Sequence, residues 1–202
     1  MKRLLFIPSL FVIAFSLYGE PSSFEWRFGF FSVVGDDYRA LPLSQAAQMK
    51  DGDRFRLLVS SESDAYCYIL DEQPDGVVCQ MFSGRLSARK AVFIPSGEGE
   101  DCFILGPPDG VDKIHILVAA VRLDKLEQLL AKLPKDTDPA SASRKVIDEV
   151  SRIRQALSSF AESPSKPAVM GASTRFLAAK AESEAIEFSG SSTYVKTIRI
   201  AH

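Results

Sequence analysis

The feature that most constrains the fold is a series of seven short β-type segments between residues 24 and 121. Each is rich in aromatic or β-branched side chains and is bounded by turn residues. In one of them Phe55, Leu57 and Val59 alternate with other residues, so they share one face of a strand. Seven short strands with Gly, Pro and Asp turns are typical of a β-sandwich or barrel. The expected strands are residues 24–34, 54–60, 65–70, 77–82, 91–94, 101–105 and 113–121, and the last is expected to be central.

After residue 121 the hydrophobic period changes to helical spacing. Leucines recur three or four residues apart from residue 123 to residue 133, and Pro134 ends that element. A second helix of about 20 residues begins at Asp138 and Pro139, which are suited to the N-cap and the first helical position. Its apolar stripe is expected to pack on the sandwich, with partner binding as the alternative; it comprises Val146, Val150, Ile153, Leu157 and Phe160.

A strand pattern returns at the end of the chain. Residues 194–200 alternate with period two, and residues 187–188 are also β-type. The helices are therefore either an insertion before a closing β element or a cover on one end of the sandwich. Three connecting segments are also interpreted: residues 41–49 as a connector with one helical turn, 163–172 as a loop and 176–182 as a helical turn or two.

The N-terminus has the layout of a secretory signal peptide. Lys2 and Arg3 precede an uncharged apolar run of 14 residues, 4–17, and polar residues follow. At about 1.5 Å per residue this run is shorter than the roughly 30 Å hydrocarbon core of a bilayer. Cleavage after Gly19 is expected, with cleavage after Ser16 or an uncleaved anchor as alternatives. The mature chain is expected to be exported, without a transmembrane span, and to carry a net charge of −4 instead of −2.

Charge and cysteine content exclude some classes of function. An acidic chain lacks the clustered basic residues that a nucleic-acid binder needs. Three cysteines and two histidines offer little material for a metal site, so neither a metal nor a cofactor is expected. Export permits disulfides, but the pairing of Cys67, Cys79 and Cys102 is left open, and buried free thiols are the alternative. A tight turn at residues 73–76 would place Cys67 opposite residue 82 or 83.

Residues 49–121 carry a series of motifs in a characteristic order. A Lys-x-Gly-Asp turn is followed by a strand, an aromatic strand, an Asp-Gly turn, a strand ending in Phe, a strand ending in Pro and a Gly-Pro turn. This order resembles the bacterial family of domains of unknown function called DUF4384. The resemblance implies an immunoglobulin-like β-sandwich, exported or attached to kinase-like and caspase-like proteins, and it supplies no catalytic residues. The chain departs from the pattern at Ala65, in place of Gly, and at the inserted Asp109. The segments that match are residues 49–55, 56–60, 65–70, 75–76, 77–82, 93–95 and 106–114.

The predicted organisation is thus a mainly β protein: an immunoglobulin-like β-sandwich with a C-terminal helical insertion and a closing strand. Its parts are a signal peptide, a sandwich, a helical insertion and a closing β element, at residues 1–19, 20–121, 122–183 and 184–202.

Few side chains qualify as functional candidates. An aromatic set on one face of the first strand is either core or a binding surface for a partner or a sugar; it comprises Phe24, Trp26, Phe28 and Phe30. His115 lies within a strand without a nucleophile motif, and His202 is expected to be frayed. Residues 71–76 begin like a calcium loop, but position twelve is Phe82, so a turn is expected.

These observations favour an exported, non-catalytic interaction or structural module of the bacterial cell envelope. Its partner is expected to be another envelope protein. A small-ligand or glycan-binding β-sandwich is the alternative. A hydrolase is less favoured, because no catalytic residue accompanies His115.

Overall fold

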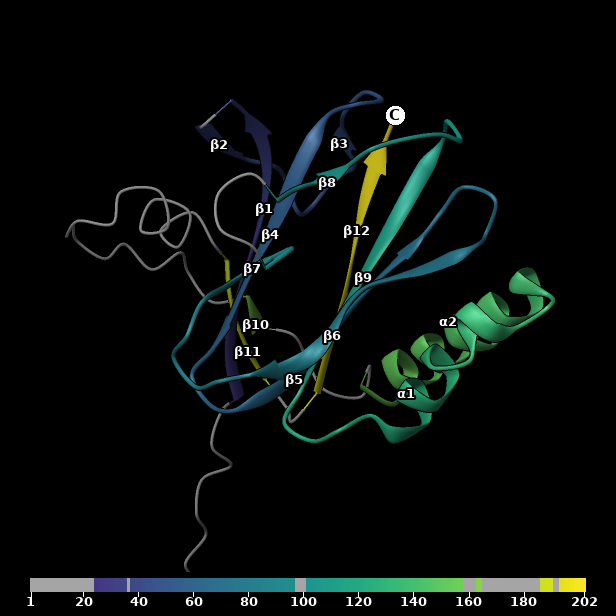
Figure 1. Cartoon of the computed structure of the whole chain (residues 1–202). Helices are drawn as coiled ribbons and strands as arrows, with labels where there is room; N and C mark the ends of the chain where they lie inside the picture. The colour runs from purple at the N-terminus through teal and green to yellow at the C-terminus, as the bar shows by residue number, and fades with distance from the viewer. Residues whose placement is uncertain (1–23, 36, 97–100, 158–162, 165–185, 191–192) are drawn as a thin grey trace, which may run out of the picture.

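The computed structural model describes residues 24–35, 37–96, 101–157, 163–164, 186–190 and 193–202. The described chain forms three layers: two β-sheets face each other, and two helices lie outside one of them (Figure 1). This is a mainly β sandwich with a helical insertion, as the alternation and the change of period predicted.

The first sheet, called sheet A, is built around β1 (Phe24–Val34). β1 pairs antiparallel with β4 (Arg54–Ser61) on one side and β11 (Ile186–Gly190) on the other. At Gly35 the backbone turns with φ of 59°, a conformation that glycine adopts without strain, and β2 folds back onto the end of β1. The remaining strands of sheet A are β2 (Asp37–Ala40), β7 (Val92–Ile94), β8 (Phe103–Ile104) and β10 (Ser163–Pro164).

The second sheet, called sheet B, has the order β3-β12-β9-β5-β6. Its central strand is β9 (Val111–Ala119), the apolar segment that was expected to be central. β12 (Thr193–Ala201) pairs antiparallel with β9 over its whole length, and its last two residues, Ile200 and Ala201, also pair with β3 on the other side. The other strands are β3 (Ala47–Gln48), β5 (Ala65–Glu72) and β6 (Val78–Leu86), and β3 is parallel to β12.

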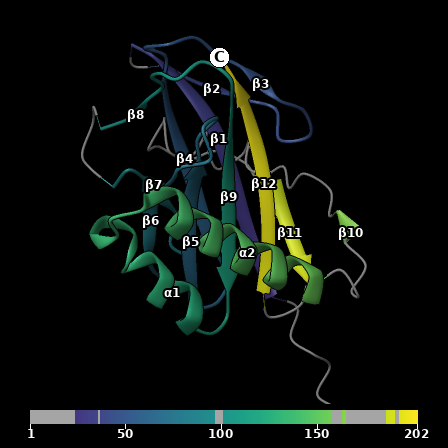
Figure 2. The ribbon, with the colours of Figure 1, turned by 90° about the vertical axis from the view of Figure 1, so that its right-hand side faces the viewer.

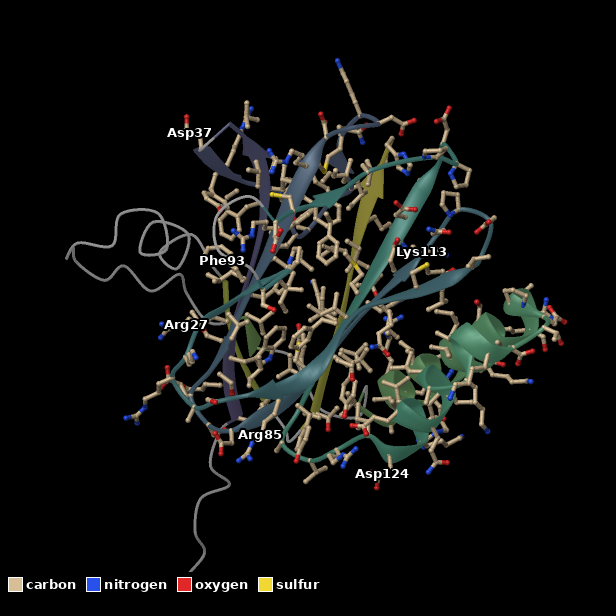
Figure 3. All side chains as sticks on the ribbon, in the orientation of Figure 1. Arg27, Asp37, Arg85, Phe93, Lys113 and Asp124 are labelled. Carbon is tan, nitrogen blue, oxygen red and sulfur yellow. The ribbon has the colours of Figure 1, made fainter. Side chains whose placement is uncertain are left out.

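The aromatic face of β1 points into the space between the two sheets. Phe24, Trp26, Phe28 and Phe30 are 7%, 1%, 0% and 1% exposed, and the Trp26 ring centroid lies 4.9 Å from that of Tyr194 in sheet B. Side chains from both sheets meet in this space (Figure 3). The hypothesis that these four residues form a binding surface is therefore wrong, because their shared face is the one that packs on sheet B. They form the core, which was the alternative.

The helices cover the outer face of sheet B (Figure 2). α1 (Asp124–Leu130) and a short 3₁₀ helix, η1 (Leu133–Lys135), precede α2 (Pro139–Leu157). The Asp138 carboxylate accepts a hydrogen bond from the Ser141 amide at 3.1 Å, as expected for an N-cap. The predicted stripe packs on the sheet: Val146, Val150 and Ile153 are buried and Leu157 is partly buried, whereas Phe160 lies outside the described residues.

The structure corrects three local expectations. Ala47 is buried beside Ile200 in a parallel strand pair, and residues 41–49 contain no helical turn, because pairing with β12 overrides local propensity. Ser163 and Pro164 form a short strand within the expected loop. The closing β element divides between the sheets, with β11 in sheet A and β12 in sheet B. The expected signal peptide and the helical turn at 176–182 lie outside the described residues.

None of the helices that the structure describes combines the length and the apolar character needed to cross a bilayer.

The contact between α2 and sheet B makes a stability prediction with a matched control. Ile153 in α2 is 8% exposed and Ile104 in β8 is 69% exposed. We expect Ile153→Ala to lower the free energy of unfolding by about 2–4 kcal/mol, because it removes buried methyl groups and leaves a cavity. Ile104→Ala should change it by less than about 0.5 kcal/mol. Urea unfolding followed by circular dichroism measures both. Equal, small effects would mean that the helix does not pack on the sheet in solution.

Candidate functional site

The candidate site is a pocket of about 330 Å³ at the end of the sandwich where the C-terminus lies, at the top of Figure 1. It lies between the inner face of sheet B and the segment that contains β8 and the following loop. The lining residues come from six strands or their ends and mix carboxylates, amides and apolar groups: Phe55, Asp71, Gln73, Cys79, Gln80, Met81, Phe103, Ile104, Leu105, Gly106, Pro107, Pro108, Asp112, Ile114 and Ile200.

Two carboxylates extend the inner face of sheet B beyond its apolar part. Asp71 in β5 lies opposite Ile114 in β9, and Asp112 in β9 lies opposite Ile200 in β12. The buried residues Ile114 and Ile200 belong to the core between the sheets. Side chains two residues apart in a strand share a face, so Asp112 follows Ile114 on the core side. The pocket is thus the place where the core changes from apolar to acidic.

A register shift in the β5–β6 hairpin shapes one wall of the pocket. The shift occurs between Ile69 and Leu70, whose partners are Phe82 and Gln80, so β6 contains one extra residue. Such a bulge interrupts the alternation of a strand and redirects side chains. It explains why the consecutive residues Cys79, Gln80 and Met81 all line the pocket.

A close backbone contact joins two loops beside the pocket. Gly110 has a φ of 150°, and a Cβ atom there would lie 2.8 Å from the Pro74 Cβ. Only glycine permits this approach, because any side chain would overlap the Pro74 ring. The turn after β5 and the loop before β9 are therefore held together at the end of the sandwich.

The two carboxylates are poorly satisfied within the protein. The Oδ1 atoms of Asp71 and Asp112 are buried and have no hydrogen-bond partner. Burial, together with the charge of Asp112, raises the pKa of Asp71 from 3.8 to about 7. Burial also raises the pKa of Asp112, although the nearby His202 opposes this effect. Buried acceptors without donors are costly, so this end of the core favours any ligand that supplies a positive charge or N–H groups.

A second cluster adjoins the pocket through Asp112. The His202 side chain is fully buried, and its Nδ1 lies 3.1 Å from the Asp51 Oδ1 while its Nε2 lies 3.3 Å from the Asp112 Oδ2. Ligand atoms of Asp51, Asp109 and His202 all lie within 4.8 Å of one another, a spacing that suits a metal ion. The expectation that His202 is frayed is wrong, because its backbone pairs with Gly110 through two hydrogen bonds of 3.0 and 3.1 Å.

His115 lies on the other face of sheet B, beneath α2. Its Nε2 is 2.8 Å from the Glu72 Oε2, and its Nδ1 is 2.9 Å from the Thr197 Oγ1. Lys113 donates to the other Glu72 oxygen, and Arg154 of α2 donates to Thr197. Burial lowers the pKa of His115 although Glu72 opposes it, which favours the neutral ring.

This chain of hydrogen bonds has the order carboxylate, imidazole, hydroxyl. Arg154 occupies the Thr197 hydroxyl, and the His115 side chain is only 6% exposed. The network therefore joins β5, β9, β12 and α2.

The cysteines occupy three separate environments. Cys67 is buried in the core, Cys79 is exposed and Cys102 is half-buried, and all three are free thiols. Cys67 lies opposite Gly84, one residue beyond the predicted position, because of the register shift in β6. Cys79 lies opposite Asp71, four residues along β5, or about 13 Å, which is too far for a disulfide with Cys67.

Sequence reasoning missed the pocket and its carboxylates. The sequence places Asp71 at the start of an expected turn, but the turn lies at residues 73–77 and Asp71 belongs to β5. Asp112 lies in one of the segments that resemble the DUF4384 motifs. The sequence offers one signal for them. Asp71 and Asp112 each lie near the end of a strand, at a position that alternation assigns to the same face as the buried apolar residues. Comparisons with protein-family models, curated proteins and solved structures gave no significant match. The chemistry of this site is therefore inferred from its geometry alone.

The raised pKa of Asp71 predicts a pH-dependent effect of Asp71→Asn. A carboxyl whose pKa is about 7 in the folded protein, against an ordinary value of 3.8, costs no stability below about pH 4. It lowers stability progressively between pH 4 and 7 and has its full effect above pH 7. We expect the substitution to raise the free energy of unfolding by about 1–3 kcal/mol at pH 8, with no difference near pH 4. Urea unfolding at the two pH values measures this. Asp148→Asn, on the exposed face of α2, is the control and should show no such dependence. An equal effect of Asp71→Asn at both pH values would contradict the assignment.

Proposed function

We propose that the protein is an exported, non-catalytic β-sandwich module of the bacterial cell envelope that binds a small cationic ligand in the end pocket. The observation that carries the proposal is the pair of buried, unpartnered carboxylate oxygens of Asp71 and Asp112. A protonated amine supplies both the charge and the N–H donors that these oxygens lack. Hydrogen bonds between charged partners are about twice as strong as neutral ones.

The rest of the pocket favours a ligand with a ring. Phe103 packs on Phe55 with ring centroids 5.3 Å apart, and Pro107 and Pro108 lie in the same lining. Gln73 and Gln80 add amide groups that donate and accept hydrogen bonds. Small-molecule sites combine apolar walls with a few polar groups in this way. An amino sugar has a cationic group, hydroxyls and apolar ring faces, so it meets all three demands.

This proposal follows the small-ligand and glycan alternative, at a different site from the aromatic face of β1. Binding to another envelope protein is the second candidate. The aromatic face of β1, which the sequence offered to either a partner or a sugar, is buried and favours neither. A relationship to the DUF4384 family is also part of the proposal, supported by the motif order in residues 49–121.

The proposal that the protein is exported is supported by its basic and apolar N-terminal residues. N-terminal sequencing of the protein from cell fractions tests it: we expect a mature start near Glu20 outside the cytoplasm. An intact Met1 in the membrane pellet would contradict cleavage.

Binding is tested with glucosamine and N-acetylglucosamine, which share a ring and differ in the charged amine. Titration at pH 7, followed by NMR shifts of pocket amides, should show glucosamine binding at least about tenfold more tightly, because only it carries a cation for Asp71 and Asp112. Asp71→Asn and Asp112→Asn should each weaken glucosamine binding by about tenfold or more. Asp148→Asn is the matched control and should have no effect.

Two results would overturn the binding proposal. Equal affinity for the two sugars would show that charge does not select the ligand. Unchanged glucosamine binding in both pocket variants, each checked by circular dichroism, would place the ligand elsewhere.

A further inference from the structure

We infer that Asp51, Asp109 and His202 form a site for a divalent transition-metal ion of the zinc class, with Asp112 as the residue that orients the histidine. This inference goes beyond the proposed ligand pocket and does not depend on it. The three ligand atoms lie within 4.8 Å of one another and come from three separate segments of the chain.

One pair of these atoms already lies close to metal-ligand spacing. The His202 Nδ1 and the Asp51 Oδ1 are 3.1 Å apart. Two ligands at about 2.0–2.2 Å from a zinc ion, at tetrahedral angles, are separated by about 3.3–3.6 Å, a few tenths of an ångström more than this pair. The pair can therefore hold an ion with little movement, and Asp109 supplies the third ligand.

The far side of the imidazole points to the same conclusion. The His202 side chain is fully buried, and its Nε2 has no properly aligned hydrogen bond, although the Asp112 Oδ2 lies only 3.3 Å away. Metal-binding histidines usually donate their second N–H to a carboxylate, which fixes the tautomer and leaves the other nitrogen free for the ion. Asp112, itself 7% exposed, is placed for that role.

The backbone holds the segments in register. His202 pairs with Gly110, which adjoins Asp109, and the Met49 amide donates to the Ala201 carbonyl at 3.0 Å. The turn that carries Asp51 is closed by the hydrogen bond from Asp53 N to Lys50 O, at 2.9 Å. The ligands are therefore brought together by strand pairing, so little of the chain has to be ordered when the ion binds.

The donor set selects the type of ion. One imidazole with carboxylates suits zinc, manganese or iron, whereas calcium and magnesium prefer all-oxygen sites. Three protein ligands leave a fourth position for water. Binding would also join the end of β12 to the loops before β4 and β9.

Calorimetric titration of the purified chain with Zn²⁺, Ca²⁺ and Mg²⁺ tests the inference. We expect one Zn²⁺ per chain and at least about tenfold weaker binding of Ca²⁺ and Mg²⁺. Asp51→Asn, Asp109→Asn and His202→Ala should each weaken Zn²⁺ binding by at least about tenfold. Asp112→Asn should weaken it about 10- to 100-fold without removing a direct ligand.

Controls separate this site from general effects. Asp148→Asn removes a carboxylate on α2 and should leave Zn²⁺ affinity unchanged. His202 is buried, so His202→Ala is checked for folding by circular dichroism, whereas Asp51 and Asp109 are exposed and their variants should fold normally. Absence of saturable Zn²⁺ binding, equal affinity for Ca²⁺, or unchanged binding in Asp51→Asn and Asp109→Asn would overturn the inference. Neither residue lines the pocket, so these results leave the glucosamine test unaffected.

Discussion

The structure depends most on the pairing of β12 with β9. Nine residue pairs, from Thr193 with Ala119 to Ala201 with Val111, join the end of the chain to the central strand of sheet B. Without β12, the most apolar strand would have a row of unpaired N–H and C=O groups, which invites aggregation. The same pairing places Ile198 in the core between the sheets and Val195 against the helices. The side chains of β12 therefore pack on both of the other layers.

Alternation along the strands then divides the polar residues between two sites. Asp71 and Asp112 face the sandwich interior, whereas Glu72 and Lys113, their neighbours in sequence, form an ion pair on the other face of sheet B. Glu72 and Lys113 find their hydrogen-bond partners within the protein, and their network connects sheet B with α2. Asp71 and Asp112 do not, because their Oδ1 atoms are buried without hydrogen-bond donors. The unsatisfied group is therefore the better candidate for binding something from outside.

The local sequence pattern was sufficient to predict the strands and helices, but it was not sufficient to predict the candidate site. The bounds of β1, the N-cap of α2 and the strand character of residues 194–200 follow from alternation, capping and helical spacing, which act over short distances in sequence. Alternation showed that the aromatic residues of β1 share a face, but not that this face is covered by sheet B. Asp71 and Asp112 are 41 positions apart, and their proximity follows from the β5–β9 register, which local pattern does not reveal. The same holds for His202, whose burial depends on pairing with Gly110.

Amide hydrogen exchange measured by NMR tests the central role of β12 most directly. If β12 is an integral strand of sheet B, those of its amides that donate to β9 should exchange as slowly as the β9 amides, with opening free energies close to the global free energy of unfolding. The amides of the short outer strands β2 and β8 should exchange faster. Rapid exchange throughout residues 193–201, with β9 still protected, would show that the end of the chain opens independently. That result would contradict the account, because the core, the helix interface and the acidic end of the sandwich would no longer depend on this pairing.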